Sequence, residues 1–421
     1  MKIFFSAGDP SGDVNTAGII ALLKKKYPDA QLLGLGGPKM QEAGLICHTD
    51  FAKFGKMGYV EVIKSLPFFL SEQRKFIKMM VGGRSVADCR SPAVLVCVDF
   101  SGFNKKLVVA ANKLGIKVLW FIAPMIWVWK RKKYIKFFQK YKAHIACIFP
   151  FEVEYWKPIE TVSFVGNPSV SRLPTTGRCP TDSRRLTLAK DFTLALIPGS
   201  REQEVRKILP FMLDCALALK AKYGDMRITV SKTSYLPDEL YETSAAITLE
   251  TDFNEVLKVA DLALVTSGTA SLQVGLAEIP HIVLYKMSPL SHFIIQKIVG
   301  QKRITVGLSN IVAEKVGGRL PTGDRQSASD RQSATDRQSA TDRIVPEFVQ
   351  EEMVTEDVVK ALEDIIEKDY EKIRADLSEI RKLLGSKDPN EEVVKIIEGL
   401  LSLDLLSLDL QNQNKGSGDY Q

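Results

Sequence analysis

Asp99 and Asp9 are the carboxylates of this sequence best placed to take a proton from a hydroxyl group. Asp99 follows the apolar run 93–98 directly, so we expect it at the end of a buried strand. Partial desolvation raises the basicity of such a carboxylate, and deprotonating a sugar hydroxyl requires a base of that kind. Asp9 follows the strand-like run 2–7. We predict both as catalytic; the alternative is that Asp99 only hydrogen-bonds amides of its own loop.

The turn SAGDPSGD, which contains Asp9, also has features of an acceptor site. Its glycines permit close backbone approach, and the helix that follows offers N–H groups to an anion or a sugar hydroxyl. We therefore assign Ser11, Gly12 and Asp13 to acceptor binding, together with Asn104 in the loop of Asp99. The alternatives are that Asp13 caps the helix and that Asn104 is structural.

Two tryptophans lie close together in the segment APMIWVWKRKK. Trp127 and Trp129 are two residues apart and are followed by four basic residues. Indole rings stack on sugars and contact acyl chains, so we predict both as acceptor- or lipid-binding. The alternative is that one or both belong to the core.

The motif LIPGSREQEV is suited to holding phosphate. Gly199 and Ser200 expose backbone amides where a strand passes into a helix, and Arg201 adds a cation at the same place. We predict all three as nucleotide-binding. The alternative is a solvated pair of Arg201 with Glu202 or Glu204.

A second helix start of this kind follows in the motif VTSGTASLQ. Ser267, Gly268 and Thr269 offer hydroxyls and amides to phosphate, and Gln273 lies one helical turn further on, within reach of a ribose hydroxyl. Two such starts without a Walker or GxGxxG pattern predict a nucleotide sugar rather than ATP or NAD. The sequence has no DxD metal motif, so we predict no metal and no cofactor, with Arg201 and helix dipoles stabilising the departing diphosphate.

Short apolar runs alternate with helical periodicity along both halves of the chain, which predicts parallel sheets covered by helices. The fold class expected is α/β, with two doubly wound Rossmann-like domains facing a cleft and C-terminal helices. The expected strands are 2–7, 31–35, 93–98, 118–122, 145–149, 162–165, 192–197, 226–230, 262–265 and 281–284.

The expected domains follow from this alternation and from changes in composition. They are an N-terminal acceptor-side domain (1–170), a linker (171–190), a C-terminal UDP-sugar-binding domain (191–365), C-terminal helices that pack on the N-terminal domain or on a partner subunit (366–410), and a disordered tail (411–421). Residues 320–343 contain a six-residue repeat, DRQSAT, without a hydrophobic face, which predicts a disordered insertion.

The overall composition is that of a globular protein with a moderate excess of positive charge. The 421 residues are 45% hydrophobic and 25% charged, and 57 Lys and Arg against 50 Asp and Glu give a net charge of +7. This favours anionic partners, but no nucleic-acid-binding motif is present.

The six cysteines form no CxxC pair, which indicates a reducing compartment. Without a secretory signal or an apolar run of about 20 residues, we expect a cytoplasmic protein.

Taken together, these loops resemble the lipid A disaccharide synthase family, which has the glycosyltransferase-B fold. The resemblance covers residues 1 to about 352. The matching segments, in order, are GDPSGD, MGYVEV, VDFSGFN, APMIWVWK, FPFE, FVGNP, LIPGSREQEV, TSGTASLQ and the pair Ser309–Asn310. The sequence departs from the family at Asp9 and Gln273, where the family usually has Glu.

The resemblance implies inverting transfer of 2,3-diacylglucosamine from UDP to the 6-hydroxyl of 2,3-diacylglucosamine 1-phosphate, giving a β-1′,6 disaccharide and UDP. It implies that Asp99 is the general base and that Asn310 lies near the nucleotide. The alternatives are another UDP-sugar enzyme of the same fold, such as a glycolipid glycosyltransferase or an epimerase, and a catalytically weakened membrane-surface binding protein.

The resemblance also implies peripheral association with the inner face of the cytoplasmic membrane, and often a homodimer. Two segments, Leu66–Met80 and Met287–Arg303, mix aromatic or aliphatic residues with Lys and Arg, as an interfacial helix does. For either segment alone, the alternative is an ordinary amphipathic core helix.

Overall fold

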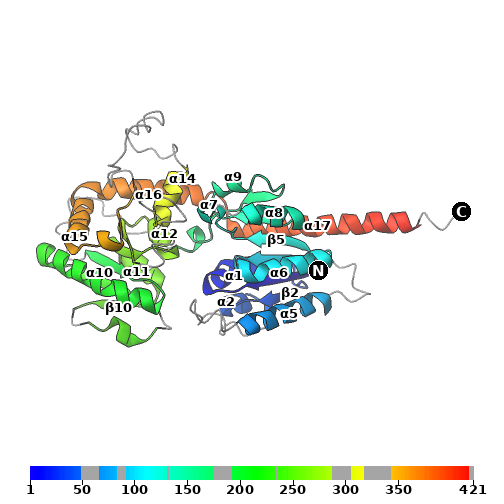
Figure 1. Cartoon of the computed structure of the whole chain (residues 1–421), viewed down its shortest axis with the longest axis horizontal. Coiled ribbons are helices and arrows are strands. Elements are labelled where there is room, and N and C mark those ends of the chain that lie inside the picture. Colours follow the sequence, from blue (N-terminus) through cyan, green and yellow to red (C-terminus); the bar gives the residue numbers. More distant parts are fainter. Residues whose placement is uncertain are drawn as a thin grey trace, which may run out of the picture. The chain divides into compact units, whose positions relative to one another are not determined.

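Each half of the chain forms its own parallel sheet, as the computed structural model in Figure 1 shows. The structure describes residues 1–48, 66–82, 92–129, 132–173, 192–233, 236–243, 245–286, 305–316 and 343–416. Unit 1 comprises Met1–Pro168 and Leu384–Gln421, and unit 2 comprises Ser169–Leu383.

The seven-stranded sheet of unit 1 has the order β3-β2-β1-β4-β5-β6-β7, and all of its pairs are parallel. Its central strands are buried along almost their whole length, because helices cover both faces. The order reverses direction between β1 and β4, and ligands bind at such switch points. The strands are β1 (Lys2–Ala7), β2 (Gln31–Leu35), β3 (Ile46–Cys47), β4 (Ala93–Val98), β5 (Lys117–Phe121), β6 (His144–Cys147) and β7 (Val162–Phe164).

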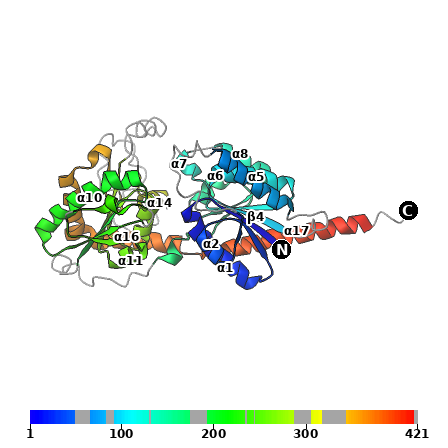
Figure 2. The ribbon, with the colours of Figure 1, turned by 90° about the horizontal axis from the view of Figure 1, so that it is seen from below.

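The helices of unit 1 form two layers (Figure 2). One face of the sheet is covered by α5 (Leu66–Gly82), α6 (Ser101–Lys113), α8 (Lys132–Tyr141) and α9 (Glu152–Trp156). The other face is covered by α1 (Pro10–Lys26), α2 (Pro38–Glu42) and α17 (Pro389–Gly416). A short helix, α7 (Ile126–Trp129), follows β5.

Unit 2 repeats the arrangement with the strand order β10-β9-β8-β11-β12-β13, again all parallel and with its reversal between β8 and β11. The strands are β8 (Thr193–Ile197), β9 (Arg227–Ser231), β10 (Thr248–Glu250), β11 (Leu262–Thr266), β12 (His281–Tyr285) and β13 (Glu347–Val349). The helices are α10 (Glu202–Tyr223), α11 (Phe253–Val259), α12 (Thr269–Leu276), α14 (Leu308–Val316), α15 (Thr355–Asp364) and α16 (Tyr370–Leu384), with a π-helical turn at Ile365–Asp369 and 3₁₀ turns at Val170–Arg172, Asp238–Tyr241 and Gln350–Glu352.

The last helix returns to unit 1, where Val393, Ile397 and Leu401 join the core that also contains Ile19 and Leu23 of α1. Its backbone continues to Gly416, past residue 411, where the sequence predicts a disordered tail. Leu, Gln and Lys favour helix. After Gly399 the next glycine is Gly416, where α17 ends, so no glycine or proline interrupts the helix between them.

Several predicted features lie outside the described residues: the segment MGYVEV, most of the linker 171–190, the segment Met287–Arg303, and the insertion 320–343 apart from Arg343. None of the helices that the structure describes combines the length and hydrophobicity needed to cross a bilayer.

Candidate functional site

The two predicted catalytic carboxylates lie at the switch point of unit 1. β1 and β4 are paired in register, with Ala7 opposite Val98. Asp9 and Asp99 each follow the end of one of these strands, so the two loops leave the sheet side by side.

The turn that carries Asp99 has an uncommon backbone conformation. Asp99 and Phe100 both have positive φ angles, 40° and 43°, in a region that residues other than glycine seldom adopt. The buried side chain of Asn104 holds this turn: its amide donates to the carbonyls of Ser6, Val98 and Asp99 (3.3, 3.3 and 2.9 Å), and its oxygen accepts the Ser6 hydroxyl at 2.6 Å. Asn104 therefore positions Asp99, which is the structural alternative named for it from the sequence.

Gly8 allows the two loops to approach each other. A Cβ atom at Gly8 would collide with the ring of Phe100. That ring stacks on Phe103 at a centroid distance of 5.3 Å and also meets Phe69 of α5. An aromatic cluster beneath the turn thus fixes the residue next to Asp99.

The environment of Asp99 favours its neutral form. The residue is exposed at the tip of its turn, yet surrounding protein displaces much of the solvent near the carboxyl group. This desolvation, followed by the negative charge of Asp9, raises the pKa of Asp99 to about 6, while the amide of Phe100 opposes the shift. A carboxylate that titrates near neutrality is suited to general-base catalysis.

The acidic residues Asp9 and Asp13 bind the backbone amides of two different helices. Asp9 is the N-cap of α1, and its Oδ1 accepts the amide of Gly12 at 2.5 Å. Asp13 is buried and accepts the amides of Gly37, Lys39 and Met40 (3.0, 3.1 and 2.9 Å) at the start of α2. The alternative that Asp13 caps α1 is wrong: Asp9 occupies that position, and Asp13 holds the next loop instead. Ser11 is exposed, and its hydroxyl accepts the side-chain amide of Asn15.

Trp127 belongs to the core rather than to an open surface. It is 8% exposed, its ring meets Phe151 edge-on, and its Nε1–H donates to Glu152 Oε1 at 3.0 Å. Glu152 also accepts the amide of Phe149, and burial raises its pKa to about 7. Trp129 ends α7, and its side chain lies outside the described residues.

The two predicted phosphate-binding turns are neighbours at the switch point of unit 2. β8 and β11 are paired in register, with Ile197 opposite Val265. Gly199–Arg201 follows β8 and Ser267–Thr269 follows β11. Both turns therefore lie at the same edge of one sheet, each at the start of a helix, and together they present two sets of helix N-terminal amides.

Arg201 forms an ion pair with Glu204 at 2.7 Å, as the surface-pair alternative expects. The Arg201 side chain is 71% exposed, and Glu204 also lies against Gly199, where a Cβ atom would meet its carboxylate. Gly199 itself has a φ of +106°, which favours glycine. An anion binding at this helix start would compete with Glu204 for Arg201.

The second turn is open on its outer side. Gly268 is the N-cap of α12 with a φ of +148°, and no atom lies within 4 Å of the position a Cβ would take. Thr269 is exposed, and Gln273 is half-buried one turn further on. The Ser267 hydroxyl points the other way and donates to the Val306 carbonyl at 2.7 Å.

Comparison with known proteins decides the family. The sequence matches the family model for lipid-A-disaccharide synthetase over residues 3–334. The chain belongs to this family. The lipid-A-disaccharide synthase of Geobacter sulfurreducens is 28% identical over 95% of this chain and 97% of its own length. That of Myxococcus xanthus is 30% identical over 76% of this chain and 82% of its own length.

A solved structure agrees at the level of the fold. The glycotransferase of kitacinnamycin aligns with a TM-score of 0.57 at 14% identity, covering 95% of this chain and 98% of that one. The predicted fold, two Rossmann-like α/β domains of the glycosyltransferase-B type with C-terminal helices, is confirmed. Family membership makes the chain a glycosyltransferase, as predicted.

One residue that the family resemblance places near the nucleotide has its polar atoms turned inward. Asn310 is 3% exposed; its amide donates to the Val345 carbonyl and to Glu347, and its oxygen accepts the Val345 amide. Both polar atoms of its side chain are thus bonded, and they join α14 to Val345 and to Glu347 at the start of β13. Asn310 therefore supports the packing of α14 inside unit 2, and its side chain is not exposed to a ligand.

Two buried acids, Glu152 and Glu347, were not assigned a role from the sequence. Each is an acid within a run of apolar residues, FPFEV for Glu152 and IVPEFV for Glu347. Charged residues in such runs must find partners when they are buried. That pattern is the signal that would have identified both as members of internal hydrogen-bond networks.

Proposed function

We propose that this synthetase family member transfers 2,3-diacylglucosamine from UDP to the 6-hydroxyl of 2,3-diacylglucosamine 1-phosphate. The observation that carries the proposal is the position of Asp99, a carboxylate with a raised pKa at the switch point of unit 1. Family membership supplies the substrate class.

In this reaction Asp99 accepts the proton of the acceptor 6-hydroxyl. The oxygen attacks the anomeric carbon of the donor, the bond to the UDP oxygen breaks on the opposite face, and the anomeric configuration inverts. The β-phosphate of UDP takes the electron pair of the broken bond. Gly199, Ser200, Gly268 and Thr269 surround the diphosphate with amides and hydroxyls, and the charge on it is met by Arg201 and the N-termini of α10 and α12. Ser267 holds the second turn in place through its bonds to the carbonyls of Val306 and Leu284. Gln273 binds the ribose.

Within unit 1, the acceptor binds beside the loops of Asp9 and Asp99. Ser11 contacts it directly. Gly12 is buried and its amide is bonded to Asp9, so it acts through the turn, as Asp13 and Asn104 act through the loops they hold. Trp127 supports the turn that carries Trp129, which we assign to the acyl chains.

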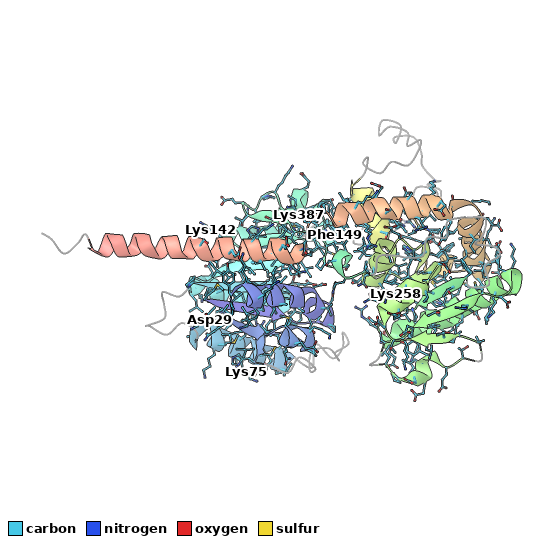
Figure 3. All side chains as sticks on the ribbon, turned by 180° about the vertical axis from the view of Figure 1, so that it is seen from behind. Asp29, Lys75, Lys142, Phe149, Lys258 and Lys387 are labelled. Atoms are coloured by element: carbon cyan, nitrogen blue, oxygen red, sulfur yellow. The ribbon has the colours of Figure 1, made fainter. Side chains whose placement is uncertain are left out.

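The helical face of unit 1 over α5, α6 and α8 serves as the membrane-facing surface. These three helices contain ten Lys and Arg residues and one acid, Glu72, which is buried and paired with Lys75 at 2.7 Å. Lys75 lies at the outer edge of unit 1 in Figure 3. Half-buried Phe68 and Phe69 begin α5, while Phe76 and Met80 pack into the core, so the helix has both an interior and an outward role. Basic residues beside aromatic ones favour an anionic bilayer.

We propose that this surface binds the inner face of the cytoplasmic membrane, and a homodimer is part of the same proposal. Cosedimentation with phosphatidylglycerol vesicles, compared with phosphatidylcholine vesicles, tests the membrane surface. Sedimentation velocity tests the dimer.

The reaction itself is tested by incubating the purified full chain with the two lipid precursors and detecting products by mass spectrometry. The proposal expects the disaccharide 1-phosphate and UDP in equal amounts. UDP without disaccharide would indicate another UDP-sugar reaction, and binding of UDP without any product would indicate a binding protein.

Replacing Arg201 by alanine is expected to weaken UDP binding by about tenfold, because a charge-assisted hydrogen bond to phosphate is lost. Glu204→Gln, which removes the competing carboxylate, is expected to strengthen binding by roughly threefold. Arg206 is the matched control, since it is an exposed arginine paired with Glu202 one turn further along α10. Calorimetric titration with UDP measures all three; equal losses in Arg201→Ala and Arg206→Ala would contradict the assignment.

Replacing Asp9 by asparagine is expected to move the acid limb of the pH profile to lower pH. The base is active when deprotonated, so kcat/KM rises through the pKa of Asp99, about 6. Removing the negative charge of Asp9 lowers that pKa, and asparagine still caps α1. The control is Asp29→Asn, an exposed carboxylate beyond the far end of α1 (Figure 3), roughly 25 Å of helix away and screened by salt. An unmoved limb in Asp9→Asn would show that Asp9 does not act on Asp99.

A further inference from the structure

Glu347 lies at the centre of a hydrogen-bond network inside unit 2. Its side chain has no exposed surface, and its two oxygens accept from four donors. Oε2 accepts the amide of Val306 at 2.9 Å and pairs with Arg343 at 3.2 Å. Oε1 accepts the amide of Gly307 at 2.9 Å and the side chain of Asn310 at 2.7 Å.

The network continues to the nucleotide-binding turn through one residue. Val306 donates its amide to Glu347 and accepts the Ser267 hydroxyl on its carbonyl at 2.7 Å. Ser267 is the first residue of the Ser267–Thr269 turn, and its own amide bonds to the Leu284 carbonyl at the end of β12. The Val306 carbonyl and the Gly307 amide belong to one peptide group, and Glu347 accepts that amide. The carboxylate therefore fixes the peptide group against which this serine is held.

Close packing gives α12 little freedom to move independently of this network. A Cβ atom at Gly275 of α12 would collide with the Ser309 hydroxyl at the start of α14, and that hydroxyl donates to the Ser271 carbonyl at 3.4 Å. The next residue, Asn310, is bound to Glu347. A displacement of the 305–310 segment is thus passed to the first turns of α12.

We propose that Glu347 is a positioning residue for nucleotide binding, acting on the Ser267–Thr269 turn through Val306 and on α12 through Asn310. The inference rests on the proposed function, because it assumes that this turn holds the UDP diphosphate. Glu347 touches no substrate; it sets where the hydroxyl and amides of the turn lie.

The test is the variant Glu347→Gln in the full chain. Glutamine offers a single oxygen acceptor and an NH₂ group, so at least one of the amides of Val306, Gly307 and Asn310 must face another donor. Glu351→Gln is the matched control, because Glu351 is exposed four residues away and loses the same charge. Ser267→Ala and the double variant Ser267→Ala with Glu347→Gln complete a cycle.

We expect Glu347→Gln to raise the Kd for UDP and the KM for the donor by roughly tenfold while kcat falls less than threefold. In the double variant the loss of UDP affinity should be smaller than the sum of the two single losses, because both changes break the same link through Val306. Melting temperature measured without nucleotide, and circular dichroism, show whether the variant folds.

The outcomes separate the inference from the function on which it rests. If the wild-type chain fails to bind UDP, the proposed function falls first. If it binds UDP, and a folded Glu347→Gln binds as tightly as Glu351→Gln, the positioning role is overturned. Full additivity in the cycle would also overturn it, because the two side chains would then act independently. Should Glu347→Gln not fold, the isolated Ser267→Ala change must still raise the donor KM, or the link through Val306 has no effect.

Discussion

Replacing Asp99 by alanine is expected to lower kcat by about 10²–10⁴-fold, the usual contribution of a general base. Asp99 directly follows β4, desolvation raises its pKa to about 6, and the side chain of Asn104 fixes its turn. Asp99→Asn should lose nearly as much, because the amide keeps the shape but cannot accept the proton. Disaccharide formation under saturating substrates measures both.

The distinguishing measurement is UDP affinity. Asp99 belongs to unit 1, whereas the predicted phosphate-binding turns belong to unit 2. We therefore expect the Kd for UDP in both variants to stay within about threefold of the wild type. A parallel loss of turnover and UDP binding would remove Asp99 as the base and make it a structural residue.

The fold was predictable from the sequence where strands are buried on both sides. The expected strands 2–7, 31–35 and 93–98 have the observed bounds, because a continuous apolar run in a parallel sheet is distinct from its polar flanks. The strands β3, β10 and β13 were missed. They are two or three residues long and lie at sheet edges, where a strand pairs with a neighbour on one side only. So short a strand contains too few apolar residues to form a recognisable run.

Helix starts were predicted too late in the loops that carry the site. α1 begins at Pro10, although the sequence suggested that the helix follows the whole turn SAGDPSGD. α6 begins at Ser101, although Asn104 was expected in the loop of Asp99. Proline is well tolerated at the first position of a helix, and Asp9 is the N-cap here. An analysis that follows only the spacing of apolar residues assigns this Asp-Pro pair to a turn. The functional loops are consequently shorter than expected, and Ser11 and Gly12 lie within α1 itself.

The sequence could locate polar residues at strand ends but not say which way each one points. Asp99, Gly268 and Thr269 are exposed, as ligand-binding residues must be, whereas Asp13, Asn104 and Asn310 turn inward to bind backbone groups. All six occupy the same kind of loop. The difference depends on contacts with residues distant in sequence, such as Ser6 with Asn104 and Val345 with Asn310, which a local pattern does not contain.

Deleting residues 320–343, the repeat insertion, is expected to leave the stability of unit 2 close to that of the full chain. The segments on either side of the insertion are held together, because Asn310 exchanges two hydrogen bonds with Val345 and Arg343 pairs with Glu347. The deletion joins Arg319 directly to Ile344, so an arginine again precedes Ile344 and can take the place of Arg343. Shortening the connection in this way changes its closure free energy by only about 1–2 kcal/mol.

The same deletion with Arg319→Met is the decisive counterpart. It leaves the buried carboxylate of Glu347 without a cation, which is expected to lower the free energy of unfolding by about 3 kcal/mol, or roughly 6–12 °C in Tm for a unit of this size. Differential scanning calorimetry compares the two deletions with the full chain. In a Glu347→Gln background the Arg319→Met change should cost little, because the charge it compensates is gone. A large loss in the first deletion would instead show that the repeat contributes structure, and equal stability of the two deletions would show that the arginine does not stabilise Glu347.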